Sequence, residues 1–214
     1  SRVLEKSKTV AFLVIQHDSV RLEKYWNGVN EESLTNSFSM AKSIVSLLLG
    51  CAIEDGFVEG VNQSIFDFVP ELAVDGSPDV KVRHLLEMSS GYDWLEHYKR
   101  PISVTAKAYY GTNLQKLIFS RGFLGDPGLN YKYSSGSTQL LGFLLERAVG
   151  ENLSSYAGRV LWSKIGAKQN ALWTLDYGGG SEKVFCCFNS NARDFSKLGL
   201  LMLHGGRLGF LEKK

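Results

Sequence analysis

Ser39 and Lys42 form the pair of residues whose types and spacing could do covalent chemistry. At the start of a helix, a separation of three residues puts the hydroxyl and the amine on one face, a turn apart. Serine is a poor nucleophile at neutral pH, and a lysine can act as its base where burial disfavours the charged amine. The free N–H groups of a helix N-terminus also favour negative charge on an attacked carbonyl oxygen. The pair therefore predicts nucleophilic catalysis.

Tyr133 offers a second proton-transfer group, in the polar segment Tyr133-Ser134-Ser135 just before a predicted long helix. A phenol held near a lysine is pushed toward its charged form and can exchange protons with a nucleophile or a leaving group. Each residue also has an ordinary structural alternative. Ser39 could lie near a helix cap beside a solvated Lys42, and Tyr133 could be a packed ring with a bonded hydroxyl.

Composition and charge exclude several classes of protein. Of the 214 residues, 44% are hydrophobic and 21% are charged, which predicts a globular chain with a substantial core. A net charge of +2, from dispersed basic residues, predicts no nucleic-acid partner. The longest apolar stretch, from Ile44 to Ile53, is interrupted by Ser46 and Gly50 and is too short to cross a bilayer. We therefore expect no membrane span.

The three cysteines are Cys51, Cys186 and Cys187. We expect buried, inert thiols, because these residues cannot make a symmetrical disulfide framework and no CxxC spacing indicates zinc. The segment from Ser1 to Lys8 lacks the apolar core of a signal peptide, so we expect that any export signal was removed or never existed. The compartment stays open, with a periplasmic or secreted location slightly favoured over a cytoplasmic one.

The local patterns predict a β-hairpin followed mostly by helices. Two β-rich runs, Val10 to Ile15 and Val20 to Trp26, are separated by polar residues, which is typical of a hairpin. Apolar positions then recur from Met40 to Ile53 and stop before Gly56, which predicts a long helix. Further helices are predicted at Val80–Met88, Thr138–Val149 and Ala192–Leu203.

This order of elements predicts an α/β domain with a mainly helical lobe inserted into it. Residues 1–55 would hold the hairpin and the nucleophile helix, residues 56–180 the lobe with the Tyr-x-Ser motif, and residues 181–214 the return to the α/β domain. A sheet begun by a single hairpin is marginal, and no convincing strand follows in the last residues. We therefore expect the sheet to be incomplete in this chain.

Four sequence blocks, in order and spacing, resemble the β-lactamase-related serine hydrolases. These blocks are Phe38-Ser39-Met40-Ala41-Lys42-Ser43, the run from Val82 to Gly91, Pro127-Gly128 with Tyr133-Ser134-Ser135-Gly136, and Leu140-Leu141-Gly142. The similar branch contains class C β-lactamases, D-aminopeptidases, carboxylesterases and 6-aminohexanoate-oligomer hydrolases, and the runs 182–189 and 192–195 resemble the last group especially. The resemblance implies an α+β, β-lactamase/transpeptidase-like fold, with an antiparallel sheet flanked by helices and a mainly helical lobe.

The resemblance also assigns roles to particular residues. It implies that Ser39 is acylated, that Lys42 assists its deprotonation and that Tyr133 acts as general acid and base. Ser135 stands where many relatives have asparagine, and it would contact the substrate or Lys42. Tyr98 would line the substrate pocket.

One part of the family pattern is missing. Relatives carry a third motif, Lys-Thr-Gly or a His-x-Gly or other Gly-containing variant, on a strand that also supplies the second oxyanion donor. The sequence holds no convincing copy. His204-Gly205-Gly206 fits formally, but it follows a predicted helix and is interpreted as a turn, and His84 is interpreted as structural. Loss of one oxyanion donor costs about 10² to 10³ in rate.

The sequence thus predicts a serine hydrolase that forms an acyl-enzyme on a small ester, amide or lactam, without a metal or a cofactor. A carboxylesterase or amidase is preferred to a true β-lactamase, because Ser135 replaces asparagine. One alternative is a non-catalytic binding or sensor module, and another is a truncated product that folds only with a partner or not at all. Neither nucleic acid nor a membrane is an expected partner, and a homo-oligomer is allowed.

Overall fold

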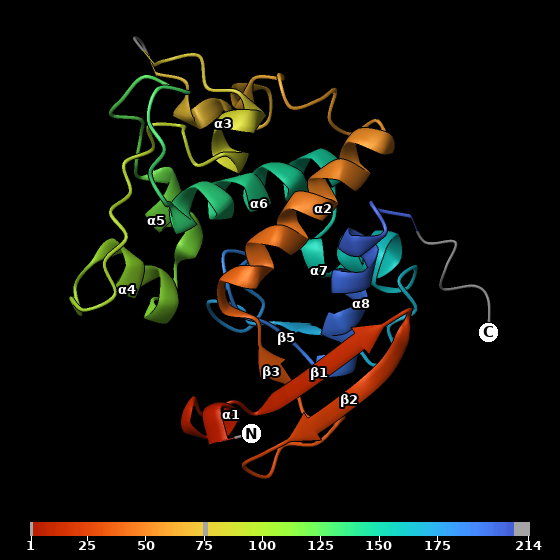
Figure 1. Ribbon diagram of the computed structural model, residues 1–214. Helices are drawn as coiled ribbons and strands as arrows, with labels where there is room; N and C mark the ends of the chain where they lie inside the picture. Colours follow the sequence, from red (N-terminus) through yellow and green to blue (C-terminus); the bar gives the residue numbers. More distant parts are fainter. Residues whose placement is uncertain (1, 75–76, 208–214) are drawn as a thin grey trace.

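The computed structural model describes residues 2–74 and 77–207 (Figure 1). Its helices are α1 (Arg2–Lys6), α2 (Ala41–Glu54), α3 (Val82–Leu86), α4 (Val104–Tyr110), α5 (Leu114–Phe119), α6 (Ser135–Val149), α7 (Leu153–Ala157) and α8 (Ala192–Leu203). Short 3-10 turns lie at η1 (Phe38–Met40), η2 (Ile65–Asp67) and η3 (Pro70–Leu72), and a π-helical turn lies at η4 (Gly158–Trp162). The predicted helices before Gly56, before Gly150 and after Asn191 are confirmed.

The strands form two small antiparallel sheets in the described part of the chain. They are β1 (Ala11–Gln16), β2 (Ser19–Tyr25), β3 (Thr35–Asn36), β4 (Leu172–Trp173) and β5 (Phe188–Ser190). One sheet is the β1–β2 hairpin, and the other has the order β3-β5-β4. This partial sheet with flanking helices confirms the predicted α+β fold class, including the expectation of an incomplete sheet.

The hairpin forms where the β-rich runs predict it. Ala11 pairs with Tyr25 and Gln16 pairs with Ser19, with a register shift between Val14 and Ile15. The two residues between the strands, His17 and Asp18, have φ angles of 51° and 57°. Positive φ at both central residues is what a tight two-residue turn between twisted strands requires.

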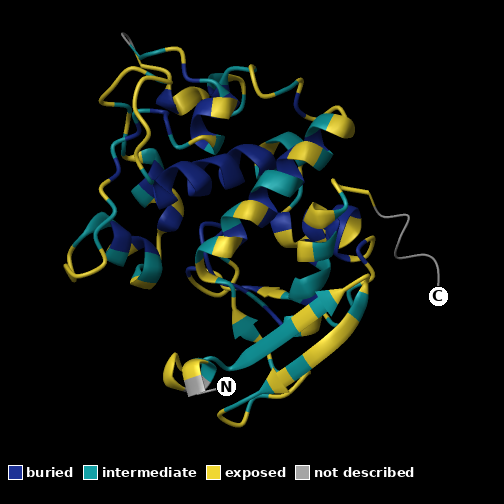
Figure 2. Cartoon of the chain, viewed as in Figure 1, coloured by how far each residue is buried: buried dark blue, intermediate teal, exposed yellow. Residues whose placement is uncertain are grey.

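The core lies between the long helices α2 and α6, which cross in the middle of the molecule (Figure 1). Helix α6 is buried without interruption from Ser135 to Leu145, and Figure 2 shows it in dark blue along most of its length. Gly142 permits a close approach on this helix, because a Cβ there would lie 2.3 Å from Val184 Cγ2. Helix α6 ends at Gly150, which takes the left-handed conformation (φ 73°) that favours glycine. The predicted division at residues 55 and 180 stays a prediction.

The cysteine prediction is wrong for one pair. Cys186 and Cys187 are joined in a disulfide, and their Cα atoms lie 3.7 Å apart. The backbone turns sharply there, with a φ of 69° at Cys187, and composition alone does not reveal such a turn. Cys51 is a free, half-buried thiol whose pKa is raised by burial. Among the described residues, every helix is too short or too polar to cross a bilayer.

Candidate active site

Ser39 lies in η1, the turn that joins the short strand β3 to helix α2. Two hydrogen bonds hold this turn: Ser37 N donates to Phe188 O of β5 at 2.8 Å, and Phe38 N donates to Asn36 Oδ1 at 2.8 Å. Phe38 has a φ of 45°, in the left-handed region. Bulky residues rarely adopt that region, and such strain often lies next to functional atoms. The turn thus presents the Ser39 side chain between the small sheet and the helical body.

The Ser39 hydroxyl contacts both partners that the sequence predicts for it. Lys42 Nζ donates to Ser39 Oγ at 3.1 Å, and Tyr133 OH donates to the same oxygen at 2.8 Å. Ser39 and Lys42 share one helical face through their spacing of three residues. Tyr133 reaches the site from the segment just before α6, 94 positions later in the chain. The structure therefore brings a hydroxyl, an amine and a phenol to one point.

Lys42 is largely enclosed, and its environment lowers its pKa. Burial is the main cause, because a charged amine loses its hydration there, while Tyr133 and the Glu96 carboxylate act in the opposite direction. Lys42 Nζ also donates to Phe185 O at 2.7 Å. Its nitrogen lies 5.2 Å from the centre of the Tyr133 ring and 5.8 Å from that of the Phe185 ring. These contacts fix the amine beside Ser39.

Gln139 of α6 holds the segment that supplies the Phe185 carbonyl. Its side-chain Nε2 donates to Glu182 O at 3.0 Å, and its Oε1 accepts from Val184 N at 2.9 Å. Gln139 is buried, so both ends of its amide are satisfied within the protein. The sequence analysis missed Phe185 as a site residue, since a backbone carbonyl leaves no signature in residue type.

Tyr133 is positioned by the start of α6. Ser134 is the N-cap of this helix, and its Oγ accepts from Ser137 N at 3.0 Å. The preceding residue is anchored as well, because Lys132 N donates to Met88 O at 2.9 Å. A serine N-cap satisfies one of the free N–H groups at a helix start. The chain therefore enters α6 in a fixed direction, with Tyr133 aimed at Ser39.

Glu96 is the acidic residue of the site, and the sequence analysis did not single it out. Its carboxylate accepts from Trp94 Nε1 at 2.7 Å, from Ser135 N at 2.9 Å and from Ser135 Oγ at 2.9 Å. Ser135 is fully buried, so its hydroxyl is directed to Glu96 and not to Lys42. A contact of Ser135 with substrate stays a prediction. The alternation Trp94, Glu96, Tyr98 before the tyrosine motif was the signal that could have found Glu96.

Gly136 allows the start of α6 to lie directly against the rings of Trp94 and Tyr92. A Cβ at this position would lie 2.3 Å from Trp94 Cε3 and 2.7 Å from Tyr92 Cε1, inside the distance that atoms tolerate. The two aromatic rings are themselves stacked, with centroids 6.4 Å apart. Only glycine lets the first turn of α6 pack against the Trp94 ring. The glycine thus keeps Trp94 and Glu96 close to the site.

Tyr98 lies at the edge of the site and is 61% exposed. Its ring centre is 6.4 Å from that of Tyr109 on α4. Burial of the hydroxyl and the nearby Glu96 carboxylate raise the pKa of Tyr98, so its phenol stays neutral. The structure therefore places Tyr98 next to aromatic neighbours, and its contact with a substrate stays a prediction.

The two histidines considered in the sequence lie away from these atoms. His84 is buried, its Nδ1 accepts from Lys81 N at 3.1 Å, and burial lowers its pKa. His204 follows α8, and its Nε2 lies 2.8 Å from Asp18 Oδ1 at the hairpin turn. The glycines after it, Gly205 and Gly206, have φ angles of 64° and 81° and form a turn. These contacts agree with the interpretation of His84 as structural and of His204-Gly205-Gly206 as a turn.

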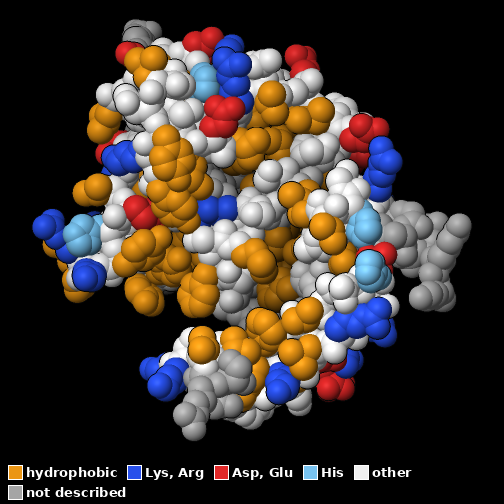
Figure 3. Space-filling model, in the orientation of Figure 1, with side chains coloured by type: hydrophobic (Ala, Val, Ile, Leu, Met, Phe, Trp, Pro, Cys, Tyr) orange, Lys and Arg blue, Asp and Glu red, His pale blue; other side chains and the backbone are white. Residues whose placement is uncertain are grey.

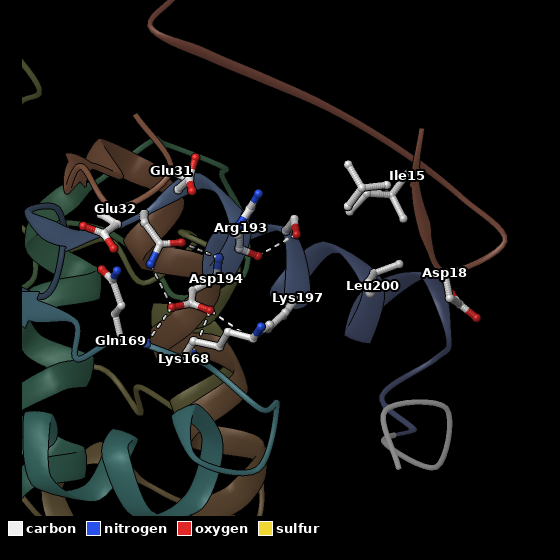
Figure 4. A pocket seen from close by; sticks show the side chains of 13 residues that line it. Ile15, Asp18, Glu31, Glu32, Lys168, Gln169, Arg193, Asp194, Lys197 and Leu200 are labelled. Carbon is white, nitrogen blue, oxygen red and sulfur yellow. Dashed lines mark hydrogen bonds and ion pairs between the residues drawn. The ribbon is translucent and has the colours of Figure 1, made fainter. Parts of the chain in front are cut away.

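A cavity of about 500 Å³ lies away from Ser39, between the hairpin and α8 (Figure 4). Its central carboxylate, Asp194, accepts from Lys168 N at 2.9 Å, Gln169 N at 3.0 Å, Asn191 Nδ2 at 2.9 Å and Lys197 Nζ at 2.9 Å. These hydrogen bonds join α8 to the segment before β4, and they satisfy both oxygens of the Asp194 carboxylate. We interpret this cavity as a structural junction.

Comparisons with known proteins identify the family of the chain. The family model described as Beta-lactamase matches residues 3–178. A 6-aminohexanoate-dimer hydrolase of Paenarthrobacter ureafaciens is 30% identical over 220 residues, which covers 95% of this chain and 54% of that protein.

Solved structures show the same fold. A protein of Bacillus anthracis that is provisionally named a 6-aminohexanoate-dimer hydrolase superposes with a TM-score of 0.85 at 23% identity, over 96% of this chain and 57% of that one. A penicillin binding protein of Bacillus halodurans gives a TM-score of 0.72 at 15% identity, over 96% of this chain and 74% of that one. The chain thus spans little more than half the length of the two hydrolase relatives.

Proposed function

Because the chain belongs to the β-lactamase family, we propose that its site forms an acyl-enzyme at Ser39 on a small ester, amide or lactam. One observation carries the proposal: Ser39 Oγ lies 3.1 Å from Lys42 Nζ and 2.8 Å from Tyr133 OH. A nucleophile within hydrogen-bond reach of a base, which is itself oriented by further groups, is the arrangement that nucleophilic catalysis needs.

The proposed acylation has balanced proton transfers. The neutral amine of Lys42 takes the proton of Ser39 as Oγ bonds to the substrate carbonyl carbon. When the carbon–oxygen or carbon–nitrogen bond of the substrate breaks, Tyr133 gives its proton to the leaving group, and Lys42 returns a proton to Tyr133. Water then attacks the acyl carbon, the bond to Oγ breaks, and Ser39 regains its proton. The lowered pKa of Lys42 supports its role as base.

We favour an ester or an open-chain amide over a β-lactam as the substrate. In this chain the Tyr-x-Ser motif ends in Ser135, whose hydroxyl donates to Glu96 Oε1 at 2.9 Å. That hydroxyl is fully buried and cannot offer the amide group that asparagine would. A substrate whose recognition depends on that amide is therefore disfavoured.

A second candidate is a module that is acylated but does not turn over. Neither of the two small sheets in the described ranges carries a Lys-Thr-Gly sequence. Without a second oxyanion donor, both acylation and deacylation slow by about 10² to 10³. A reactive ester would still acylate Ser39, and slow deacylation would then leave the acyl adduct in place for the duration of the assay.

The test is a burst experiment with p-nitrophenyl acetate, followed by intact-protein mass. The proposal predicts one acetyl adduct that maps to Ser39 and release of p-nitrophenol in proportion to the protein. Ser39→Ala should remove the adduct, and Ser43→Ala, an exposed serine on the same helix, should keep it. An adduct that decays indicates a hydrolase, and one that persists indicates the acylated module. A folded chain that gives no Ser39 adduct would contradict both.

A further inference from the structure

We propose that an aromatic cavity beside Ser39 binds an uncharged aromatic or branched apolar group of the substrate. This inference rests on the proposed function and adds the chemical class of the group. The cavity has a volume of about 280 Å³. Its lining residues, all from the turn before the nucleophile, Tyr98 and α4, are Phe38, Tyr98, Thr105, Ala106, Tyr109 and Tyr110.

The cavity is connected to the reacting atoms by direct packing. Phe38 is the residue before Ser39, so the cavity begins one residue from the nucleophile. On the other side, the Tyr109 ring meets the Phe185 ring edge to face, with centroids 5.0 Å apart. The Phe185 carbonyl is the group that accepts from Lys42 Nζ. A substrate attacked by Ser39 would therefore extend one of its groups over these rings.

Among the described residues, no Asp, Glu, Lys, Arg or His lines the cavity. Thr105 Oγ1 is turned inward, where it accepts from His97 N at 2.9 Å and donates to Leu95 O at 3.2 Å. Burial raises the pKa of the Tyr109 phenol, so it stays neutral. A charged substrate group would thus enter without a counter-ion from the lining, at the cost of its hydration.

Three charged side chains next to this part of the site have partners, and the exposed Lys107 of α4 does not line the cavity. The Glu96 carboxylate accepts three hydrogen bonds from Trp94 and Ser135. Lys183 Nζ donates to the backbone oxygen of Tyr109 at 2.6 Å, and Lys42 is held by Ser39 and Phe185. The cavity therefore selects by shape and apolar contact.

The rings of the cavity are unusually exposed for their size. Tyr110 is 86% exposed and Phe38 is 60% exposed. Figure 3 shows that hydrophobic side chains gather on the part of this face where Figure 1 places α4. Clustered exposed aromatic groups beside a hollow mark a surface that binds an apolar group, because burying them gains free energy.

The experiment compares two fluorophosphonates that share the reactive phosphorus group and differ in one substituent, phenethyl or 6-aminohexyl. The measured quantity is the second-order rate of Ser39 labelling at pH 7, followed by intact mass. We expect the phenethyl probe to label at least about tenfold faster, since the aminohexyl ammonium must lose hydration.

Three variants identify the cavity as the cause. Tyr110→Asp places a carboxylate at the rim and should shrink or reverse the ratio of the two rates, whereas Tyr110→Phe should keep it. Tyr131→Asp adds the same carboxylate at another exposed tyrosine, which does not line the cavity, and this matched control should leave the ratio unchanged.

The outcomes separate this inference from the proposed function. Equal labelling by both probes, or a ratio that Tyr110→Asp does not change, would overturn the aromatic cavity while the labelled Ser39 still supports the acyl-enzyme. If neither probe labels Ser39 in the folded chain, the proposed function fails and this inference fails with it.

Discussion

The helical body around α6 and the β1–β2 hairpin are built in opposite ways. Helix α6 is buried from Ser135 to Leu145, whereas no residue of β1 or β2 is fully buried (Figure 2). Polar contacts join the hairpin to α8: Arg193 donates twice to Glu23, at 2.7 and 2.8 Å, and His204 lies 2.8 Å from Asp18. In the described ranges, β1 and β2 pair only with each other.

This difference shows which part of the molecule the chemistry depends on. Lys42 belongs to α2, Tyr133 leads directly into α6, and Gln139 of α6 holds the segment that carries Phe185. The site is therefore assembled by buried packing, and the hairpin supplies none of its polar atoms. Variants in the body should change catalysis or stability strongly, and variants in the hairpin should change them little.

The largest effect is expected from Tyr133→Phe. This variant keeps the ring and removes the hydroxyl that donates to Ser39 Oγ at 2.8 Å. Loss of a proton-transfer group lowers the acylation rate by about 10² to 10⁴. The burst rate with p-nitrophenyl acetate measures it, and an unchanged melting temperature shows that the fold is kept. A rate within twofold of the wild type would remove Tyr133 from the mechanism.

A stability effect of intermediate size is expected from Leu48→Ala on α2. Leu48 is 0% exposed within the core, so truncation removes buried apolar area and leaves a cavity. Such changes cost about 2 to 5 kcal/mol of unfolding free energy. Urea titration followed by circular dichroism measures the loss. A change below 1 kcal/mol would show that the body is less tightly packed than its burial indicates.

The smallest effect is expected from Val20→Ala on β2. Val20 is 50% exposed, so the variant removes little buried area and should change the unfolding free energy by at most about 0.5 kcal/mol. The same urea titration and the burst assay should both give values near those of the wild type. A loss as large as that of Leu48→Ala would erase the contrast between the two regions.

Local patterns in the sequence predicted much of this structure. Alternating runs and a polar turn located the hairpin, and the periodicity before Gly56 and Gly150 located α2 and α6. A spacing of three residues predicted that Ser39 and Lys42 would meet. These predictions succeed because each depends on neighbours along the chain.

Contacts between distant segments could not be derived in this way. Glu96 meets Ser135 across 39 positions, and the Phe185 carbonyl meets Lys42 across 143. The aromatic cavity likewise joins Phe38 to α4 through tertiary packing. The bond between Cys186 and Cys187 depends on a local left-handed turn at a residue other than glycine, which sequence statistics rarely indicate.

The most direct test of an activated serine in the helical body is the pH dependence of Ser39 labelling by a fluorophosphonate. Burial lowers the pKa of Lys42 below its ordinary value of 10.5, and only the neutral amine can accept the Ser39 proton. The labelling rate should therefore rise with pH through an ionisation below 10.5.

Lys42→Arg should remove this rise, because a guanidinium stays protonated throughout the range. The account predicts a rising profile in the wild type and a slow, flat one in the variant. A flat wild-type profile, or the same rise in Lys42→Arg, would contradict the assignment of Lys42 as the base of Ser39.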